Sequence, residues 1–378
     1  MSILIIFITK KNWNLISYIS RTFNAKAMKK NTKRLYNIYS KEDLQDQLSA
    51  EDDDRIVLSF YKYALIPNPE QFRDQLYSDF NSLGVFGRIY VSVEGLNAQI
   101  SVPNQKFQAF EQFIYDHEIL TGIRLNIAIE FENESFLKLK IKTRKKIVAD
   151  GLDDASFDVT NRGIHLDAKS FNEITDRDDT VIIDMRNHYE SEVGHFDKAI
   201  TPDVETFKES LPIIDDMLQE HKDKNIVMYC TGGIRCEKAS AYYKHRGFEK
   251  VYQLDGGIIE YARQAEALGL TNKFKGKNFV FDERMGERIS KDIISKCHQC
   301  EAPSDDHTNC ANEACHILFI QCGDCEDQYE SCCSQKCRDF KRLPQEQQEK
   351  IKPTMTFNGT LSGKGRYKAK RKDEKLTE

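Results

Sequence analysis

The first part of the chain alternates strand-like apolar runs with two helix-like segments. RIVLSFYKYALI is rich in β-branched and aromatic residues and ends at a proline-containing break, which indicates a strand. PEQFRDQLYSDFNSLG then carries apolar residues at spacings of four, four and three, as in a helix that ends near Gly84. A hairpin, a second helix and two further strands follow in VFGRIYVSVEGLNAQISVP, NQKFQAFEQFIYDH, RLNIAIEFE and FLKLKIKTRKKIV. This order, βαββαβ, predicts a ferredoxin-like (acylphosphatase-like) domain over residues 51–150.

A second segment, residues 160–270, alternates short apolar runs with amphipathic helices. TVIIDMR, NIVMYC and VYQLDGG have the composition of strands buried on both faces of a parallel sheet. EKASAYYKHRG and IIEYARQAEALG predict helices that end at Gly247 and Gly269. We therefore expect an α/β domain whose functional loops lie at the carboxyl ends of its strands.

The two ends of the chain show little periodicity. The apolar run Ile3–Ile8 is too short for a signal peptide, and no apolar stretch has membrane length. We interpret residues 1–50 as a poorly ordered extension, with Met28 as an alternative start, and residues 341–378 as a basic, disordered tail. The expected location is the cytoplasm, with no membrane partner.

The net charge of −5 excludes binding of nucleic acid by overall charge, so any site for a polyanion must be local. Three stretches are candidates: the strand end Lys138–Lys146, the linker Lys273–Phe279, and GRYKAKRK in the tail. Each has an alternative interpretation as solvated edge strand, linker or tail.

The loop CTGGIRC follows the buried run NIVMY and precedes a helix predicted to start near Cys236. Its glycines allow successive backbone N–H groups to point inward, and the helix terminus and the arginine add positive potential. These features are expected to lower the pKa of the cysteine thiol and make it reactive. The alternative is a buried structural cysteine. The loop residues are Cys230, Thr231, Gly232, Gly233, Ile234 and Arg235.

The size of this loop separates two classes of enzyme. Cysteine-dependent phosphatases place five residues between cysteine and arginine, whereas four separate Cys230 from Arg235. The smaller loop disfavours phosphatase activity and suits a sulfur atom carried on the cysteine. Cys236 is a candidate resolving thiol, or a residue that only packs at the helix start.

Nine of the eleven cysteines lie in one short segment within residues 271–340, which favours metal binding over disulfides in a chain without a secretion signal. Taken in order, the first four would form one zinc site, and the rest, with either Cys332 or Cys333, another. Interleaved pairing is equally permitted, an iron–sulfur cluster is an alternative, and His298, His307 or His316 could replace a thiolate. Reduced cysteines without metal remain a further interpretation. The cysteines are Cys297, Cys300, Cys310, Cys315, Cys322, Cys325, Cys332, Cys333 and Cys337.

The residues around the loop resemble the rhodanese signature. In DMRNHYESEVGHFDKAI an Asp-x-Arg strand end is followed by Glu and by a Gly-His motif, and VYQLDGGIIEY resembles the later strand ending in Gly-Gly. Three of the signature residues, Asp184, Arg186 and His195, are expected to tie loops to the sheet. The signature positions are Asp184, Arg186, Glu190, Gly194, His195, Phe196 and Ala199.

The combination of all three segments resembles the tRNA uridine hydroxylase family TrhO. The strings that carry this resemblance are VSVEGLNAQISV, YCTGGIRCEKAS, TNCANEACHILFIQC and CCSQKC, and the match covers residues 57–337. The resemblance implies oxygen-dependent hydroxylation at C5 of the wobble uridine, giving 5-hydroxyuridine, with the tRNA anticodon region as partner and molecular oxygen as co-substrate. It also gives Cys230 the position of the rhodanese active-site cysteine.

Oxygen chemistry itself has no visible motif: no flavin, haem or nucleotide fingerprint and no two-histidine-one-carboxylate pattern is recognisable. One route is that the Cys230 thiolate adds to C6 of the uracil, which makes C5 nucleophilic. Arg235 and the loop amides would then stabilise developing negative charge. Two other hypotheses are a sulfurtransferase that carries a persulfide on Cys230, and a non-catalytic RNA-binding or protein-binding module.

Overall fold

The computed structural model describes residues 54–129, 135–152, 156–358 and 367. The extension predicted at residues 1–50, the alternative start at Met28 and GRYKAKRK, apart from Tyr367, lie outside the described residues. No described helix is long and apolar enough to cross a membrane.

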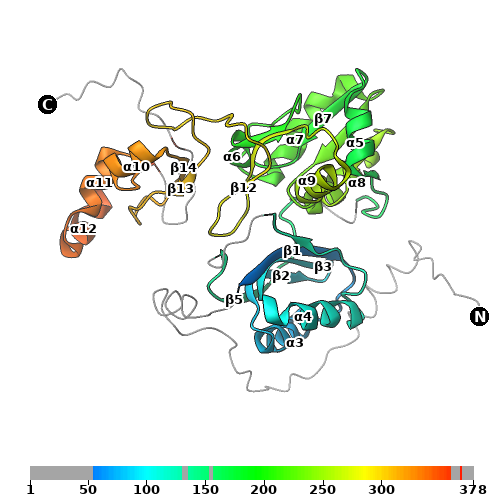
Figure 1. Ribbon diagram of the computed structural model, residues 1–378, viewed down its shortest axis with the longest axis horizontal. Helices are drawn as coiled ribbons and strands as arrows, with labels where there is room; N and C mark the ends of the chain where they lie inside the picture. The colour runs from blue at the N-terminus through cyan, green and yellow to red at the C-terminus, as the bar shows by residue number, and fades with distance from the viewer. Residues whose placement is uncertain (1–53, 130–134, 153–155, 359–366, 368–378) are drawn as a thin grey trace, which may run out of the picture. The chain divides into compact units, whose positions relative to one another are not determined.

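The first domain is the predicted ferredoxin-like sheet with an additional edge strand (Figure 1). The strand order is β4-β1-β3-β2-β5, and the apolar side chains of α3 and α4 share one core with alternate residues of the strands. Within residues 124–129, the described part of the RLNIAIEFE run, the strand β4 has two residues, and β5 runs parallel to β2. The elements are β1 (Arg55–Tyr63), α3 (Pro69–Ser82), β2 (Phe86–Ser92), β3 (Gly95–Pro103), α4 (Asn104–Asp116), β4 (Asn126–Ile127) and β5 (Leu139–Thr143).

The alternating pattern of the strands decides what the second face of this sheet presents. Leu96, Ala98 and Ile100 of β3 enter the core, so Asn97 and Gln99 point to the opposite face. The same period of two leaves tyrosine, arginine and lysine side chains of β1, β2 and β5 on that face. A sheet that is apolar on one face and polar on the other can therefore use the polar face for binding.

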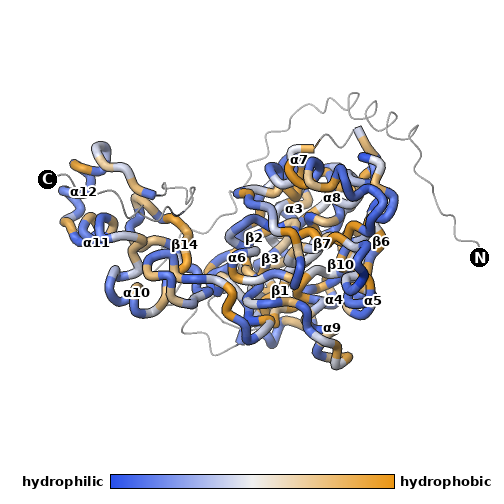
Figure 2. The backbone as a smooth tube through the Cα atoms, turned by 90° about the horizontal axis from the view of Figure 1, so that it is seen from above, coloured by the Kyte–Doolittle hydropathy of each residue, from blue (hydrophilic) through white to orange (hydrophobic). Residues whose placement is uncertain are grey.

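The second domain has the predicted parallel sheet, which has four strands in the order β6-β10-β9-β7. Apolar clusters pack on both of its faces, and all five residues of β9 are buried. The neighbouring strand β7 is also hydrophobic (Figure 2). The elements are β6 (Ile164–Leu166), α5 (Ala168–Thr175), β7 (Thr180–Asp184), α6 (His188–Glu192), β8 (Gly194–Phe196), α7 (Phe207–Leu218), η2 (Gln219–His221), β9 (Asn225–Tyr229), α8 (Ile234–His245), β10 (Val251–Leu254) and α9 (Gly257–Leu268).

In the third segment, two predictions from the sequence are wrong. The expected linker Lys273–Phe279 contains a strand, β11, which pairs with β8 and β12. The tail was predicted to be disordered from residue 341, but the helices α12 and η3 follow α11 in this part of the chain. The elements are β11 (Phe274–Asn278), β12 (Glu287–Arg288), β13 (His307–Asn309), β14 (Leu318–Ile320), α10 (Gly323–Tyr329), α11 (Gln335–Lys341), α12 (Gln345–Ile351) and η3 (Lys352–Thr354).

Polar contacts join the first domain to the second. Lys238 of α8 is buried and donates to a carboxylate oxygen of Glu94 at 2.7 Å. Arg263 of α9 donates to the backbone carbonyls of Ile127 and Ala128 at 2.7 and 2.9 Å. Removal of one partner from a buried ion pair strongly destabilises a folded protein. These contacts therefore hold the polar face of the first sheet against the second domain.

Candidate active site

Cys230 lies between the end of β9 and the start of α8, fully buried. The backbone N–H of Gly233 donates to its Sγ at 3.1 Å. Burial raises the pKa of the Cys230 thiol, but a hydrogen bond from Cys236, the positive charge of Arg235 and the loop N–H groups together lower that pKa from 9.0 to about 6. Cys230 is therefore largely a thiolate at neutral pH, the reactive form.

Two glycines allow the loop to close around Cys230. Gly233 has φ +96°, and a Cβ there would stand 2.9 Å from the hydroxyl oxygen of Tyr61. Gly257, the first residue of α9, has φ +69°, and a Cβ there would stand 2.5 Å from the carbonyl oxygens of Cys230 and Thr231. Both positions require glycine, which gives a physical reason for the second glycine of each Gly-Gly pair.

Arg235 is paired with a residue to which the sequence analysis assigned no role. Its two terminal nitrogens donate to the two carboxylate oxygens of Glu190 at 2.6 and 2.8 Å, and Glu190 is fully buried. The backbone N–H of Asn187 also donates to Glu190, so α6 holds the carboxylate in place. Glu190 thus orients the guanidinium beside Cys230. Its place in the rhodanese signature was the only sequence signal for it.

The other signature residues have structural contacts. Asp184 and Arg186 form a fully buried ion pair at 2.7 Å, and the hydroxyl of Tyr229 also donates to Asp184. A ring nitrogen of His195 lies 2.9 Å from the carbonyl oxygen of Ser191. These contacts tie the loops to the sheet.

Cys236 is the third residue of α8, because the helix begins at Ile234 and not near Cys236 as the sequence suggested. Its side chain is fully buried. Burial, followed by the hydrogen bond to Cys230 and the charge of the Cys230 thiolate, raises the pKa of the Cys236 thiol well above its ordinary value. Cys236 is therefore a thiol that donates to Cys230 at neutral pH.

Cys230 lines a cavity of about 410 Å³ whose walls come from all three segments of the chain. The polar face of the first sheet contributes Arg88, Tyr90 and Asn126, and the segment after α9 contributes Phe281. Aromatic rings, an amide and a guanidinium thus surround a reactive thiolate, in a volume typical of small-ligand sites.

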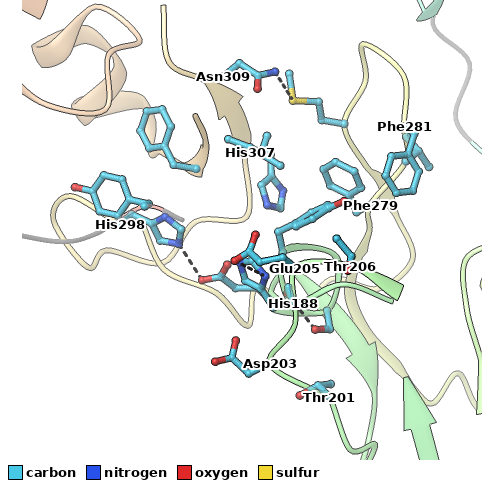
Figure 3. Close-up of a pocket in the computed structure, with 18 of the residues that line it drawn as sticks. His188, Thr201, Asp203, Glu205, Thr206, Phe279, Phe281, His298, His307 and Asn309 are labelled. Carbon is cyan, nitrogen blue, oxygen red and sulfur yellow. Dashed lines mark hydrogen bonds and ion pairs between the residues drawn. The ribbon is translucent and has the colours of Figure 1, made fainter. Parts of the chain in front are cut away.

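A wider cavity of about 1580 Å³ shares Arg88, Val280, Phe281 and Asp282 with the first (Figure 3). His298, His307 and His316, considered above as substitute metal ligands, line this cavity and belong to neither cysteine group. Nε2 of His298 lies 2.9 Å from a carboxylate oxygen of Glu192. In the described parts of the chain, no histidine joins a group of three or more close metal-binding side chains.

A group of exposed basic residues, here called the basic edge, lies on β2 and around β5. Arg88 pairs in register with Lys140, and both lie on the sheet face that lines the cavities. The positive charge of Lys142 in the first place, then burial and the remaining charges, lowers the pKa of Lys140, which shows how closely the cations gather. The basic edge comprises Arg88, Lys138, Lys140, Lys142 and Arg144.

The lysines of the Lys273–Phe279 segment are less available for binding RNA than those of the basic edge. Lys273 lies 2.7 Å from Asp176 and Lys277 lies 2.6 Å from Asp306, and the ring of Phe279 is buried. This segment therefore supports β11 more than it offers cations or a ring to RNA.

Eight of the nine clustered cysteines form two groups, within each of which the sulfur atoms lie within 4.8 Å of one another. The groups follow the interleaved pairing, and the sequential pairing that the sequence also allowed is wrong. Cys332 belongs to neither group. The first group is Cys297, Cys300, Cys322 and Cys325, and the second is Cys310, Cys315, Cys333 and Cys337.

The sulfur spacing fits a single tetrahedral ion. Sγ of Cys300 lies 3.5 Å from Sγ of Cys322, and Sγ of Cys333 lies 3.7 and 3.6 Å from those of Cys315 and Cys337. Four thiolates at Zn–S distances of about 2.3 Å would be about 3.8 Å apart. An iron–sulfur cluster places several atoms between its thiolates and needs wider spacing.

Family models match all three parts of the chain. The acylphosphatase-like domain named UPF0176 matches residues 55–147, the rhodanese-like domain matches residues 167–264, and the rhodanese C-terminal model matches residues 275–338. These matches agree with the ferredoxin-like sheet, the parallel sheet and the cysteine-rich segment of the structure.

Similar proteins extend over most of the chain. A protein of Pectobacterium atrosepticum named tRNA uridine(34) hydroxylase is 56% identical over 319 residues, covering 84% of this chain and 90% of its own. Proteins of the same name from Yersinia enterocolitica, 56% identical with 83% and 90% covered, and from an Enterobacter species, 54% identical with 84% and 91% covered, match similarly. With its site geometry and this degree of identity, the chain belongs to the tRNA uridine(34) hydroxylase family.

Proposed function

We propose that this protein hydroxylates C5 of uridine 34 in tRNA, with molecular oxygen as co-substrate, in the cytoplasm. The observation that carries the proposal is the acidic, buried Cys230 thiol at the wall of a cavity built by all three segments. The names of the similar proteins support the substrate and the reaction class.

The anticodon loop suits this site because its bases are unstacked and can be turned outward. The target uracil would enter the cavity of Cys230, between the rings of Tyr90 and Phe281 that contribute to its walls. The wider cavity, which shares Arg88 and Phe281 with it, would accept neighbouring nucleotides. The basic edge would hold the phosphates, since Arg88 lines both cavities and belongs to that edge.

In the proposed reaction the Cys230 thiolate adds to C6 of the uracil and forms a carbon–sulfur bond. The electron pair of the C5–C6 double bond then makes C5 the nucleophile that takes one oxygen atom. Loss of the C5 proton and departure of the thiolate restore the ring. The second oxygen atom leaves as water, which takes two electrons and two protons from a reductant outside this chain. Arg235 and the loop N–H groups stabilise the sulfur anion at both ends of the sequence.

Cys236 would have two roles at different stages. While Cys230 is a thiolate, its charge helps to keep Cys236 protonated and donating. Oxidation of Cys230 would remove that charge, and Cys236 could then act as the resolving thiol proposed from the sequence.

The two cysteine groups would each hold a structural zinc ion. Their eight thiols lie in a segment with few apolar residues of its own, so metal ligation would supply folding energy there. No step of the reaction passes through these ions.

The test combines gene deletion with analysis of tRNA nucleosides by mass spectrometry. Loss of 5-hydroxyuridine derivatives on deletion, restored by the wild-type gene and not by Cys230→Ser, is the expected result. Unchanged derivatives in a deletion strain with no redundant pathway would refute the function. Sulfur transfer from thiosulfate to cyanide that depends on Cys230, with tRNA unaffected, would instead establish the sulfurtransferase. Persistence of both activities in Cys230→Ser would show that the loop is structural.

A further inference from the structure

We propose that Asn126 recognises the imide edge of the uracil, with Thr231 as a second contact, and so makes the cavity beside Cys230 specific for uracil. The proposal rests on the proposed function and deepens it by naming the groups that select the base. The amide comes from the first domain and the hydroxyl from the loop of the second, so recognition and chemistry would meet at one cavity.

The first observation is an unsatisfied buried amide. Asn126 is 4% exposed and lines the same cavity as Cys230. Its Oδ1 has no hydrogen-bond partner among the residues that the structure describes. Its Nδ2 would stand 3.6 Å from a Cβ placed on Gly232, so the amide lies against the reactive loop. A buried carbonyl oxygen without a partner destabilises the folded protein, and a bound donor would remove this penalty.

Two more unsatisfied oxygens lie on residues that line this cavity. They are Oγ1 of Thr231 and Oε2 of Glu287, both without a partner within the described ranges. Native proteins rarely leave several buried polar atoms unpaired beside one another. An unpaired amide oxygen, hydroxyl oxygen and carboxylate oxygen around one cavity therefore indicate a ligand with polar groups along its edge.

The edge of uracil matches the amide of Asn126 and the hydroxyl of Thr231. Its N3–H is a donor that lies between two carbonyl acceptors, O2 and O4. An amide can accept from N3–H through Oδ1 and donate to one carbonyl through Nδ2, while a hydroxyl donates to the other carbonyl. Cytosine presents a ring nitrogen acceptor at the same place, so the Asn126 carbonyl would face another acceptor. The arrangement therefore favours uracil.

The backbone around Asn126 is held before any base arrives. Arg263 donates to the carbonyls of the two residues that follow, Ile127 and Ala128. The next N–H, of Ile129, donates to Oε1 of Glu287 at 3.1 Å. A group fixed in this way loses little conformational entropy on binding, which makes its hydrogen bond effective for selection.

The experiment removes the same hydrogen bond from either side. Anticodon stem-loops carry uridine or 3-deazauridine at position 34; the second has a C–H in place of N3–H and a 4-hydroxyl in place of the C4 carbonyl, with little change in size. We expect wild-type protein to prefer uridine by roughly tenfold or more in kcat/KM, as for a buried acceptor left unpaired. Asn126→Ala should lower kcat/KM for uridine and reduce the preference to less than about threefold. The control Asn104→Ala removes an exposed amide of the same domain and should keep the wild-type preference.

Asn126→Asp keeps an oxygen that accepts from N3–H and should retain the preference for uridine even if Asn126→Ala unfolds, as monitored by thermal melting. Equal preference in wild type and Asn126→Ala, or loss of preference in a folded Asn126→Asp, would overturn the inference. The same ratios measured as dissociation constants need no turnover. They test base recognition even where no 5-hydroxyuridine forms, an outcome that would refute the proposed function alone.

Discussion

Replacement of Cys236 by alanine tests whether its hydrogen bond makes Cys230 acidic. In the structure the thiol of Cys236 is the foremost of the groups that lower the pKa of Cys230 to about 6, against the opposing effect of burial. A hydrogen bond to a charged group contributes about 1.5–3 kcal/mol. At about 1.4 kcal/mol per pKa unit, its loss should raise the pKa of Cys230 by about one to two units, to about 7–8.

The assay is alkylation by iodoacetamide as a function of pH, because only the thiolate reacts. The chain has eleven cysteines, so modification must be quantified by mass spectrometry on the peptide that contains Cys230. The wild-type rate should be half-maximal near pH 6 and that of Cys236→Ala between about pH 7 and 8. Cys236→Ser keeps a donor and should stay closer to wild type. An unchanged midpoint in Cys236→Ala would refute the assignment of this hydrogen bond.

Three further predictions follow from the same structure. Because folding lowers the pKa of Cys230, ionisation of this thiol stabilises the folded protein above pH 9, and this stabilisation disappears as the pH falls through about 6. In urea unfolding, the difference in free energy of unfolding between wild type and Cys230→Ser should grow by about 4 kcal/mol from pH 6 to pH 9. A difference that does not change with pH would contradict this prediction. Glu190→Gln leaves a buried guanidinium unpaired and should lower the free energy of unfolding by about 3–5 kcal/mol, whereas the exposed control Glu173→Gln should change it little. Elemental analysis should find about two zinc ions per chain, about one in Cys333→Ser and about two in Cys332→Ser; less than about one in wild type would refute the metal sites.

Periodicity was sufficient to predict both sheets and the position of the Cys230 loop between a buried strand and a helix. The alternation in β3 and the apolar run Ile226–Met228 in β9 indicate which faces are buried, so these strands could be predicted locally. The grouping of the cysteines could not be predicted in this way, because their spacing along the chain does not determine which cysteine pairs lie close together in the folded protein. The role of Asn126 could not be predicted from the sequence either, since the pattern of its strand carries no information about the Cys230 loop that its side chain lies against. For Glu190 the signature gave the position, and only the structure gave its pairing with Arg235.

The interleaved order of the cysteine groups imposes a difficulty during synthesis. A nascent chain that has emerged only as far as His316 offers metal exactly half of each group: Cys297 and Cys300 from one, Cys310 and Cys315 from the other. These four could capture an ion together before either correct group is complete. Metal would then have to exchange between thiolates once Cys322 and Cys325 emerge. The rate of metal exchange on the ribosome-bound chain thus becomes a factor in the yield of folded protein.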